Sequence, residues 1–415
     1  MPQAAPVRGF FAYPWDLMDA PVEATLIAMR DDYTCNAVAL AGSYHSATLL
    51  TPRGTRSYIV ERPDASVMFH PDLAAYPPEG PWPVVDTAIA DAGILGQAAD
   101  ACARLGMQLN VWLVVLHSSA LGRAHPDLTC CNVMGDAYSF SLCPAQARVR
   151  AYAVGLVRDV CRQARPHTLL LESATFMPVL HGGHHDISLL AMNPVLQWLL
   201  TLCFCPACVA HAERAAVDVV GAADDARAML RALMNEGAAG EGVLGSALIE
   251  RPRLAAYSQS RIATVMSLLG EMRGAAAECG ARLEVIPNTG VRSITRSWAL
   301  GVQLGGLRDV ADGAMVLGYY PEPSEVITEL HQFQLLAGDL PFSLALNVGH
   351  ALSPTRAGLI ARAVAGTQAG ARGVFYYNWG LLSEERLSWV RAANEAVLTA
   401  DQPQAELAGL GRPEA

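Results

Sequence analysis

The chain contains no lysine: all 29 of its basic residues are arginine. Schiff-base aldolases, pyridoxal-phosphate enzymes and P-loop nucleoside triphosphatases each need a lysine amine for catalysis or for phosphate binding. Barrel hydrolases that bridge two metal ions with a carbamylated lysine need one as well. The absence of lysine therefore excludes these classes of protein, and we expect no organic cofactor.

Several other features are missing from the chain. No stretch offers about 18 apolar residues free of charge, glycine or proline, so we expect no membrane span. The opening residues, Met-Pro-Gln-Ala-Ala-Pro-Val-Arg, lack the charged and apolar regions of a signal peptide. The net charge is −10 and no basic run occurs, which argues against nucleic acid as a partner. We expect a cytoplasmic protein, and the sequence leaves a homo-oligomer open.

An apolar run that ends in polar or aromatic residues and leads into a helix-like stretch occurs eight times. Alternating strands and helices predict a parallel sheet. Eight of them predict an α/β fold with a single (β/α)8 TIM barrel, whose active site lies where the strands end. We predict this barrel over residues 1–400 and a disordered tail at 401–415. The predicted strands are residues 9–17, 36–45, 108–117, 168–173, 282–289, 312–320, 341–350 and 373–379.

Long connections follow predicted strands 2, 3 and 4, at residues 47–90, 119–143 and 174–257. Each is too long for a simple loop, and we predict that 174–257 is a helical insertion. Because all three leave the barrel at strand ends, we expect them to wall the active site. Periodicity also predicts a barrel helix over residues 297–310, after strand five.

Three carboxylates near strand ends are the candidate catalytic residues. Glu172 directly follows the buried run 169–171 and is placed to act as an acid, a base or a nucleophile. Asp16 ends strand one and is the first candidate for a second carboxylate of a glycosidase mechanism. Glu322, after strand six, is the next candidate. The alternatives are structural, because Glu172 can pair with an arginine, and Asp16 and Glu322 can cap helices.

Aromatic residues, histidines and asparagines at the other strand ends are the candidate substrate-binding groups. Sugar rings stack on aromatic side chains, and imidazole and amide groups bind hydroxyls. In the alternative interpretation, half of these side chains point outward and pack under helices, because successive strand residues face opposite sides. The candidates are Trp15, Tyr44, His45, His117, Asn288, Tyr319, Tyr320, Asn347, Asn378 and Trp379, and Tyr377 belongs to the same set of aromatic residues.

The most specific short motif is Cys-Phe-Cys-Pro-Ala-Cys at residues 203–208. Three thiols at this spacing can wrap one tetrahedral zinc ion, with a fourth ligand from His211, Cys130, Cys131 or Cys143. Such a site is structural, because thiolate-rich zinc sites are normally closed. In the alternative interpretation, these residues are free thiols of a reducing compartment.

The motif at 203–208 resembles the cysteine cluster of family 42 β-galactosidases, which are bacterial glycoside-hydrolase barrels. The stretches 132–136, 141–144 and 149–152 also resemble the third-strand region of this group. In that family a cysteine of the preceding loop helps to bind zinc, and Cys130 and Cys131 lie in the corresponding loop here. The resemblance implies a structural zinc ion on Cys203, Cys205, Cys208 and Cys131.

The chain departs from this family at two strand ends. The catalytic acid of the family follows an asparagine, whereas Leu171 precedes Glu172 here. The nucleophilic glutamate of the family ends strand seven, whereas residues 346–350 read Leu-Asn-Val-Gly-His and contain no acid. The resemblance therefore carries the acid role to Glu172 by position and assigns no nucleophile.

The sequence favours a glycoside hydrolase that acts on a small oligosaccharide or glycoconjugate through a two-carboxylate mechanism. One alternative is a metal-dependent barrel lyase, isomerase or hydrolase that uses His45, His117, Glu172 and the histidines and aspartate of residues 181–186. Another is a sugar-binding pseudoenzyme, which the missing acid at the end of strand seven favours.

Overall fold

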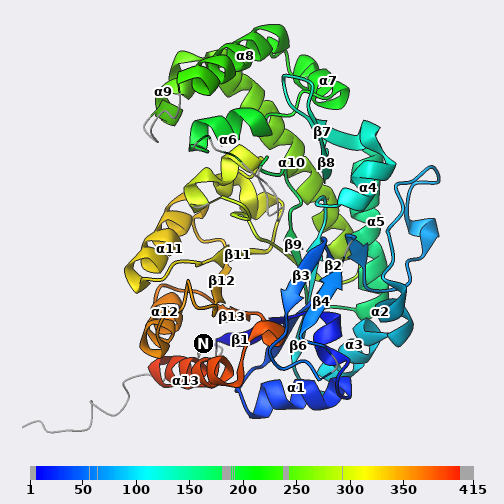
Figure 1. Cartoon of the computed structure of the whole chain (residues 1–415), viewed down its shortest axis with the longest axis vertical. Coiled ribbons are helices and arrows are strands. Elements are labelled where there is room, and N and C mark those ends of the chain that lie inside the picture. The colour runs from blue at the N-terminus through cyan, green and yellow to red at the C-terminus, as the bar shows by residue number, and fades with distance from the viewer. Residues whose placement is uncertain are drawn as a thin grey trace, which may run out of the picture.

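The computed structural model describes residues 6–401 except 56, 63, 180–187, 189, 191, 237–242 and 292. Eight parallel strands form a barrel surrounded by helices (Figure 1), which confirms the predicted (β/α)8 fold. Each strand pairs with the next along the chain, and the last pairs with the first. In this order the strands are β1 (Val7–Ala12), β2 (Ala37–Tyr44), β6 (Gln108–Val114), β9 (Thr168–Glu172), β10 (Arg282–Val285), β11 (Gly313–Leu317), β12 (Phe342–Asn347) and β13 (Gly373–Tyr377).

All eight predicted strands are present, and all eight end earlier than predicted. The largest difference is at residues 9–17, where β1 stops at Ala12 and the 3-10 helix η1 (Pro14–Leu17) follows. Pro14 suits the first turn of a helix, because its fixed φ matches and its missing N–H needs no partner there. Asp16 therefore lies in a helical turn above the barrel and not in a strand.

Helices cover the outside of the barrel, with one exception. The helix predicted over 297–310 is replaced by two 3-10 helices, η4 (Ile294–Leu300) and η5 (Leu304–Asp309). Gly301 ends the first with a φ of 95°, which is outside the helical region, and two more glycines follow at 305 and 306. The covering α-helices are α1 (Val22–Asp31), α3 (Ile94–Leu105), α5 (Ala147–Ala164), α10 (Pro252–Glu278), α11 (Pro323–Ala337), α12 (Arg356–Gln368) and α13 (Glu384–Asp401).

Three long connections rise from the carboxyl ends of β2, β6 and β9. The first carries the hairpin of β3 (Ala47–Leu50) and β4 (Ile59–Arg62), then β5 (Ser66–Val67), η2 (Leu73–Ala75) and α2 (Thr87–Ala92). The second carries α4 (Ser119–Ala124), η3 (Pro126–Leu128) and the hairpin of β7 (Thr129–Cys131) and β8 (Ala137–Leu142). The third carries α6 (Pro194–Thr201), α7 (Pro206–Arg214), α8 (Val219–Glu236) and α9 (Val243–Glu250).

The helices of the third connection pack around an apolar core of their own, at the top of Figure 1. This core includes Trp198 of α6 and Tyr257 of α10, so the long helix α10 joins it to the barrel. Within the described residues, no single helix has the length and apolarity to cross a bilayer. The pair α6 and α7, bent by 93°, meets that criterion only when the two are taken together. The predicted tail lies, from residue 402 onward, outside the described residues.

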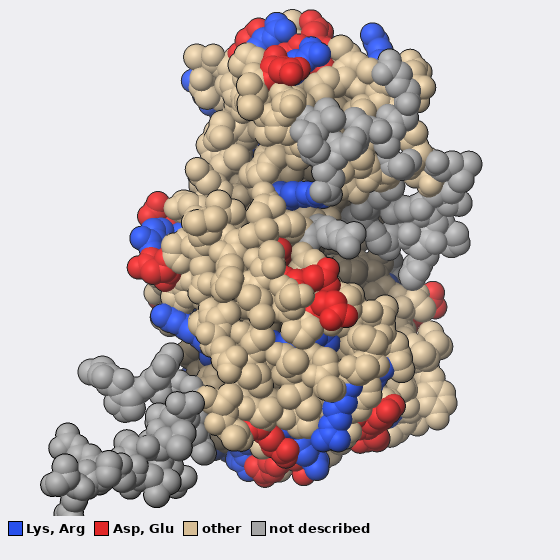
Figure 2. Space-filling view, turned by 90° about the vertical axis from the view of Figure 1, so that its left-hand side faces the viewer, with Lys and Arg blue, Asp and Glu red and all other residues tan. Residues whose placement is uncertain are grey.

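The surface carries few charges on the side shown in Figure 2. Acidic and basic side chains lie next to one another there in small groups on a largely uncharged face. Only 16% of the residues of the chain are charged.

Substitution of Gly122 tests how tightly the connection after β6 is packed, and substitution of Gly274 in α10 provides the comparison. A β-carbon on Gly122 of α4 would lie 1.8 Å from the carbonyl oxygen of Ser139 in β8. A β-carbon on Gly274 of α10 would meet nothing within 4 Å. We expect Gly122→Ala to lower the free energy of unfolding by about 1–3 kcal/mol, because backbone must move. Gly274→Ala, the control, should raise it by about 0.5–1 kcal/mol. Denaturant unfolding measures both, and equal effects would contradict the packing of α4 on β8.

Candidate functional site

Glu172, at the carboxyl end of β9, points into the mouth of the barrel. The parallel register places it opposite Val114 of β6, and Trp112 lies two residues earlier on the same face of that strand. The indole Nε1–H of Trp112 donates a hydrogen bond of 2.7 Å to Glu172 Oε2. The two neighbouring strands therefore fix both the carboxyl group and its donor.

Three tyrosines form the rest of the wall near Glu172. The hydroxyl oxygens of Tyr13 and Tyr377 are 2.6 Å apart, and those of Tyr44 and Tyr377 are 3.3 Å apart. The ring of Tyr44 lies 5.0 Å from that of Trp112, edge to face. We call Tyr13, Tyr44, Trp112, Glu172 and Tyr377 the mouth cluster.

The aromatic members of the mouth cluster surround Glu172, and its pKa is shifted. Burial raises the pKa of Glu172 from 4.5 to about 7, although the hydrogen bond from Trp112 opposes the shift. Burial also raises the pKa of Tyr319, after β11, and the nearby charge of Glu172 raises it further. The ring of Tyr319 lies 6.4 Å from that of Tyr377, so Tyr319 extends the same aromatic wall.

The two histidines predicted at strand ends lie together beside the mouth cluster. The ring of His45 stacks on Tyr44 at 4.1 Å and lies 4.7 Å from the ring of His117. Burial lowers the pKa of His45, which favours its neutral form. Neutral imidazoles both donate and accept hydrogen bonds, so this pair can bind hydroxyl groups.

The predicted asparagines hold the backbone at strand ends. Asn288 is buried, and its amide donates to Leu317 O and accepts from Leu317 N, both at 3.2 Å. Asn347 Oδ1 accepts from Gly349 N at 2.8 Å, and Asn378 Oδ1 accepts from Gly380 N at 3.1 Å. The oxygens of these three amides are therefore used in the scaffold.

Glu329 of α11 is a buried acid that the sequence did not single out. Its carboxylate accepts from Ile294 N at 2.6 Å and from Asn288 Nδ2 at 3.4 Å, which ties α11 to the loop after β10. The candidate Tyr320 lines a cavity of about 520 Å³ beside it. Glu329 occupies a position of α11 where the helical periodicity expects an apolar residue. An acid at such a position is the one signal in the sequence that could have identified it.

Glu322, the third candidate acid, does not join the mouth cluster. It is exposed at the surface and is the N-cap residue of α11. Its backbone N–H donates to Glu325 Oε2 at 3.4 Å, which completes a capping box. This position at the start of α11 is the helix-capping alternative that the sequence analysis gave for Glu322.

Asp16, Trp15 and Trp379 line a separate cavity of about 500 Å³. One oxygen of Asp16 accepts from Tyr13 N at 2.9 Å and from Gly380 N at 3.2 Å. Burial raises the pKa of Asp16 to about 7 against these two hydrogen bonds. Of the described residues that line this cavity, none belongs to the mouth cluster.

Sequence reasoning missed two members of the mouth cluster, Tyr13 and Trp112. Trp112 lies inside the apolar run of β6 and looked like ordinary core. Strand alternation provides a signal, because Trp112 and Val114 share the face that β6 presents beside Glu172. Tyr13 was hidden because the predicted first strand ran past it.

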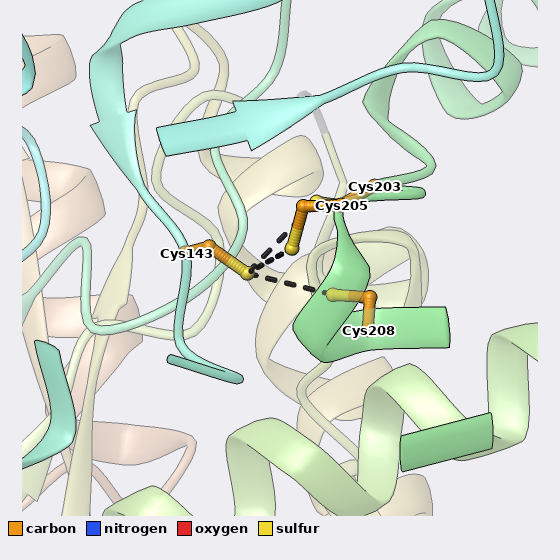
Figure 3. A group of neighbouring side chains, drawn as sticks. All are labelled: Cys143, Cys203, Cys205 and Cys208. Atoms are coloured by element: carbon orange, nitrogen blue, oxygen red, sulfur yellow. Dashed lines mark hydrogen bonds between the residues drawn. The ribbon is translucent and has the colours of Figure 1, made fainter. Parts of the chain in front are cut away.

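Four buried thiols, one from the connection after β6 and three from the connection after β9, converge on one point (Figure 3). Cys143 Sγ lies 3.4 Å from Cys208 Sγ, 3.5 Å from Cys205 Sγ and 3.9 Å from Cys203 Sγ. Cys131, predicted as the fourth ligand, is not in this group: its backbone N–H donates to Cys203 Sγ, and its own thiol faces Asn132 O. Cys143 takes that place because the hairpin β7–β8 returns the chain toward the motif.

The thiol group, Cys143 with the three cysteines of 203–208, is the one potential metal site found among the described residues. His45, His117 and Glu172 do not form such a group within that part of the chain. The predicted histidine-rich segment 181–186 lies outside the described residues.

No protein-family model and no curated protein matches this chain, but solved glycoside hydrolases share its fold. An α-L-fucosidase isoenzyme 2 from Paenibacillus thiaminolyticus is 10% identical, with a TM-score of 0.55 over 94% of this chain and 49% of that one. The PgaB (BpsB) glycoside hydrolase domain from Bordetella bronchiseptica is 13% identical, with a TM-score of 0.56 over 96% of this chain and 100% of that one.

A family 42 β-galactosidase from G. stearothermophilus is 12% identical, with a TM-score of 0.57 over 98% of this chain and 58% of that one. The chain thus spans about half the length of the fucosidase and 58% of the galactosidase. These similarities confirm that the fold resembles glycoside-hydrolase barrels, including family 42.

The raised pKa of Glu172 makes folding stability depend on pH. Below the unfolded value near 4.5 the carboxyl is neutral in both states; as pH rises toward 7, only the unfolded chain ionises, so stability falls. We expect Glu172→Gln, which cannot ionise, to gain stability relative to wild type between pH 4.5 and 8, by at most about 3 kcal/mol. The exposed Glu322→Gln is the control. Unfolding at several pH values measures this, and a pH-independent difference would contradict the burial of the charge.

Proposed function

We propose that this protein is a glycoside hydrolase that acts on a small oligosaccharide or glycoconjugate, with Glu172 as the acid–base group. The observation that carries the proposal is a buried carboxyl with a pKa of about 7 at a strand end of a glycoside-hydrolase-like barrel. Barrel enzymes carry their chemistry at this end of the strands.

The surroundings of Glu172 suit proton transfer to a glycosidic oxygen. A pKa of about 7 keeps a proton available near neutral pH while allowing its loss. The Trp112 donor holds one carboxyl oxygen, Oε2, and so fixes the orientation of the carboxyl group. Tyr44, His45 and His117 can bind sugar hydroxyls, and the ring of Tyr319 can pack against a sugar face.

The second carboxylate of such a mechanism is not assigned to Asp16 or Glu322. Glu322 is the exposed N-cap residue of α11, and the Asp16 carboxylate accepts two backbone hydrogen bonds in the other cavity. The strand that bears the nucleophile of family 42 here ends in Asn347. That observation favours one alternative, a sugar-binding protein without turnover.

A screen of aryl glycosides separates these two functions. We expect the wild type to release the phenol from at least one glycoside. Glu172→Gln should lower kcat by about a hundredfold or more, because the proton donor is lost. Glu322→Gln, the matched control, should keep its activity. Binding of sugars without turnover in the wild type would support the alternative, and full activity of Glu172→Gln would refute the assigned role.

We further propose that the thiol group binds one structural zinc ion. Tetrahedral zinc with Zn–S distances of about 2.3 Å requires S···S distances of about 3.8 Å, and the observed distances from Cys143 are 3.4–3.9 Å. The donors therefore fit the ion in number, type and spacing. A zinc ion there stabilises the fold and takes no part in the reaction.

Elemental analysis tests the zinc proposal. We expect about one equivalent of zinc in the purified protein, with loss of zinc and a lower Tm in Cys208→Ser. Cys279→Ser changes an exposed cysteine outside the group and should keep the metal. Less than about half an equivalent in carefully purified wild type would contradict the proposal.

A further inference from the structure

The cavity lined by Asp16, Trp15 and Trp379 is separate from the mouth of the barrel. It lies between α1, the hairpin β3–β4 and the loop after β13. The ring of Trp15 stacks on the mouth residue Tyr13 at 4.4 Å, so this ring pair forms a wall between the two spaces. At about 500 Å³ the cavity has the volume of a small-molecule site.

The charged groups of this cavity are balanced and fixed. Two acids, Asp16 and Asp19, and two bases, Arg53 and Arg62, line it among the described residues. The Arg53 guanidinium lies 4.5 Å over the Trp379 ring, and its Nε donates to a backbone carbonyl at 2.8 Å. The Arg62 guanidinium lies 4.9 Å over the Trp15 ring, and its Nε is 3.3 Å from an Asp86 carboxylate oxygen.

Both bases are already ion-paired, Arg62 with Asp86 and Arg53 with Glu384, and burial keeps Asp16 partly protonated near neutral pH. The little charge that is left uncompensated favours an uncharged ligand over an ion, because nothing repays an ion for its lost hydration. Immobilised guanidinium groups still offer directed N–H donors. The cavity therefore suits a neutral molecule that is rich in hydrogen-bonding groups.

Two buried polar atoms of the wall have no hydrogen-bond partner among the described residues: Trp15 Nε1 and Asp16 Oδ1. The first is a donor and the second is an acceptor. Buried polar groups in native proteins are normally satisfied, so an unpartnered pair in a cavity wall points to a ligand. Neighbouring side chains cover both atoms, so the hydroxyls of a sugar, which both donate and accept, would reach them after a small movement of the cavity wall.

The remaining wall combines the hydroxyl-bearing residues Thr25, Thr51, Thr55 and Ser57 with apolar side chains, which suits the hydroxyls and the C–H faces of a sugar. Ala24 and Ala28 contribute one face of α1, and Val60 contributes from the hairpin.

We propose that this cavity is a second carbohydrate site, which binds a neutral sugar unit through Trp15, Asp16, Arg53 and Arg62. The site is independent of proton transfer by Glu172, because Tyr13 and Trp15 separate it from the mouth. It gives the protein a place to hold one part of a glycan while another part enters the barrel.

The indole N–H signals of a ¹⁵N-labelled protein test the proposal, because Trp15 and Trp379 line the second cavity and Trp112 lies in the mouth. Trp15 reports on the second cavity and Trp112 on the mouth, and the Phe variants assign both signals. Glu172→Gln serves as background, so that sugars are not consumed. Lactose and maltose are the neutral probes, and glucuronate and glucosamine are the charged ones. We expect a neutral disaccharide to shift the Trp15 signal saturably and the charged sugars to leave it unchanged.

Filling the cavity provides the matched comparison. Ala28→Trp should raise the dissociation constant read from the Trp15 signal at least about tenfold, because the indole occupies the sugar position. Ala361→Trp places the same side chain on an exposed position of α12 and should leave binding unchanged. If Ala28→Trp does not fold, Asp16→Asn keeps the backbone acceptor and turns the free acceptor into a donor. It should weaken binding at least about threefold.

Three results would overturn the proposal: no Trp15 shift with either neutral disaccharide, a shift only with a charged sugar, or a shift that survives Ala28→Trp. Turnover is measured separately in the wild-type background. Ala28→Trp should keep kcat/KM for an aryl glycoside within about twofold, because the mouth cluster is untouched. Loss of turnover in Glu172→Gln with retained Trp15 shifts therefore distinguishes the second site from the proposed hydrolase function.

Discussion

Closure of the barrel by β1 is the constraint on which the candidate site depends. β1 pairs with both β13 and β2, and Gly9 allows this close approach, because a β-carbon there would lie 2.7 Å from Phe375 Cε1. Closure brings Tyr13, just after β1, to within hydrogen-bonding distance of Tyr377 at the end of β13. The aromatic wall beside Glu172 is thus a product of the strand pairing, and it forms only in the closed barrel.

This wall determines the chemistry of the acid beside it. Excluding water disfavours the charged carboxylate of Glu172, and the single opposing hydrogen bond from Trp112 is too weak to restore an ordinary pKa. Asp16 has the same pKa of about 7, although two backbone N–H groups and nearby Arg53 oppose its burial. The two acids are therefore similar in proton affinity and different in surroundings: aromatic hydroxyls face one, and guanidinium groups face the other.

The pattern of buried runs predicted the eight strands and the place of Glu172, because a parallel barrel buries both faces of every strand. The same pattern did not single out Trp112, because only the register of β6 against β9 shows that its side chain lies beside Glu172. Asn288 was predicted to bind substrate, yet both of its amide atoms are used by Leu317 of the neighbouring strand. Such roles depend on contacts between segments far apart in the chain, which composition and spacing do not contain.

The thiol group shows why contacts between distant segments matter for the site. It joins the connection after β6, through Cys143, to the connection after β9, through Cys203 and its neighbours. Helix α10 also contacts the motif, because the Tyr257 hydroxyl donates a hydrogen bond of 2.6 Å to Cys203 O. β6 and β9 are also the strands that carry Trp112 and Glu172. The proposed zinc ion would therefore join the connections that follow these two strands, so that binding of the metal would also stabilise the surroundings of Trp112 and Glu172.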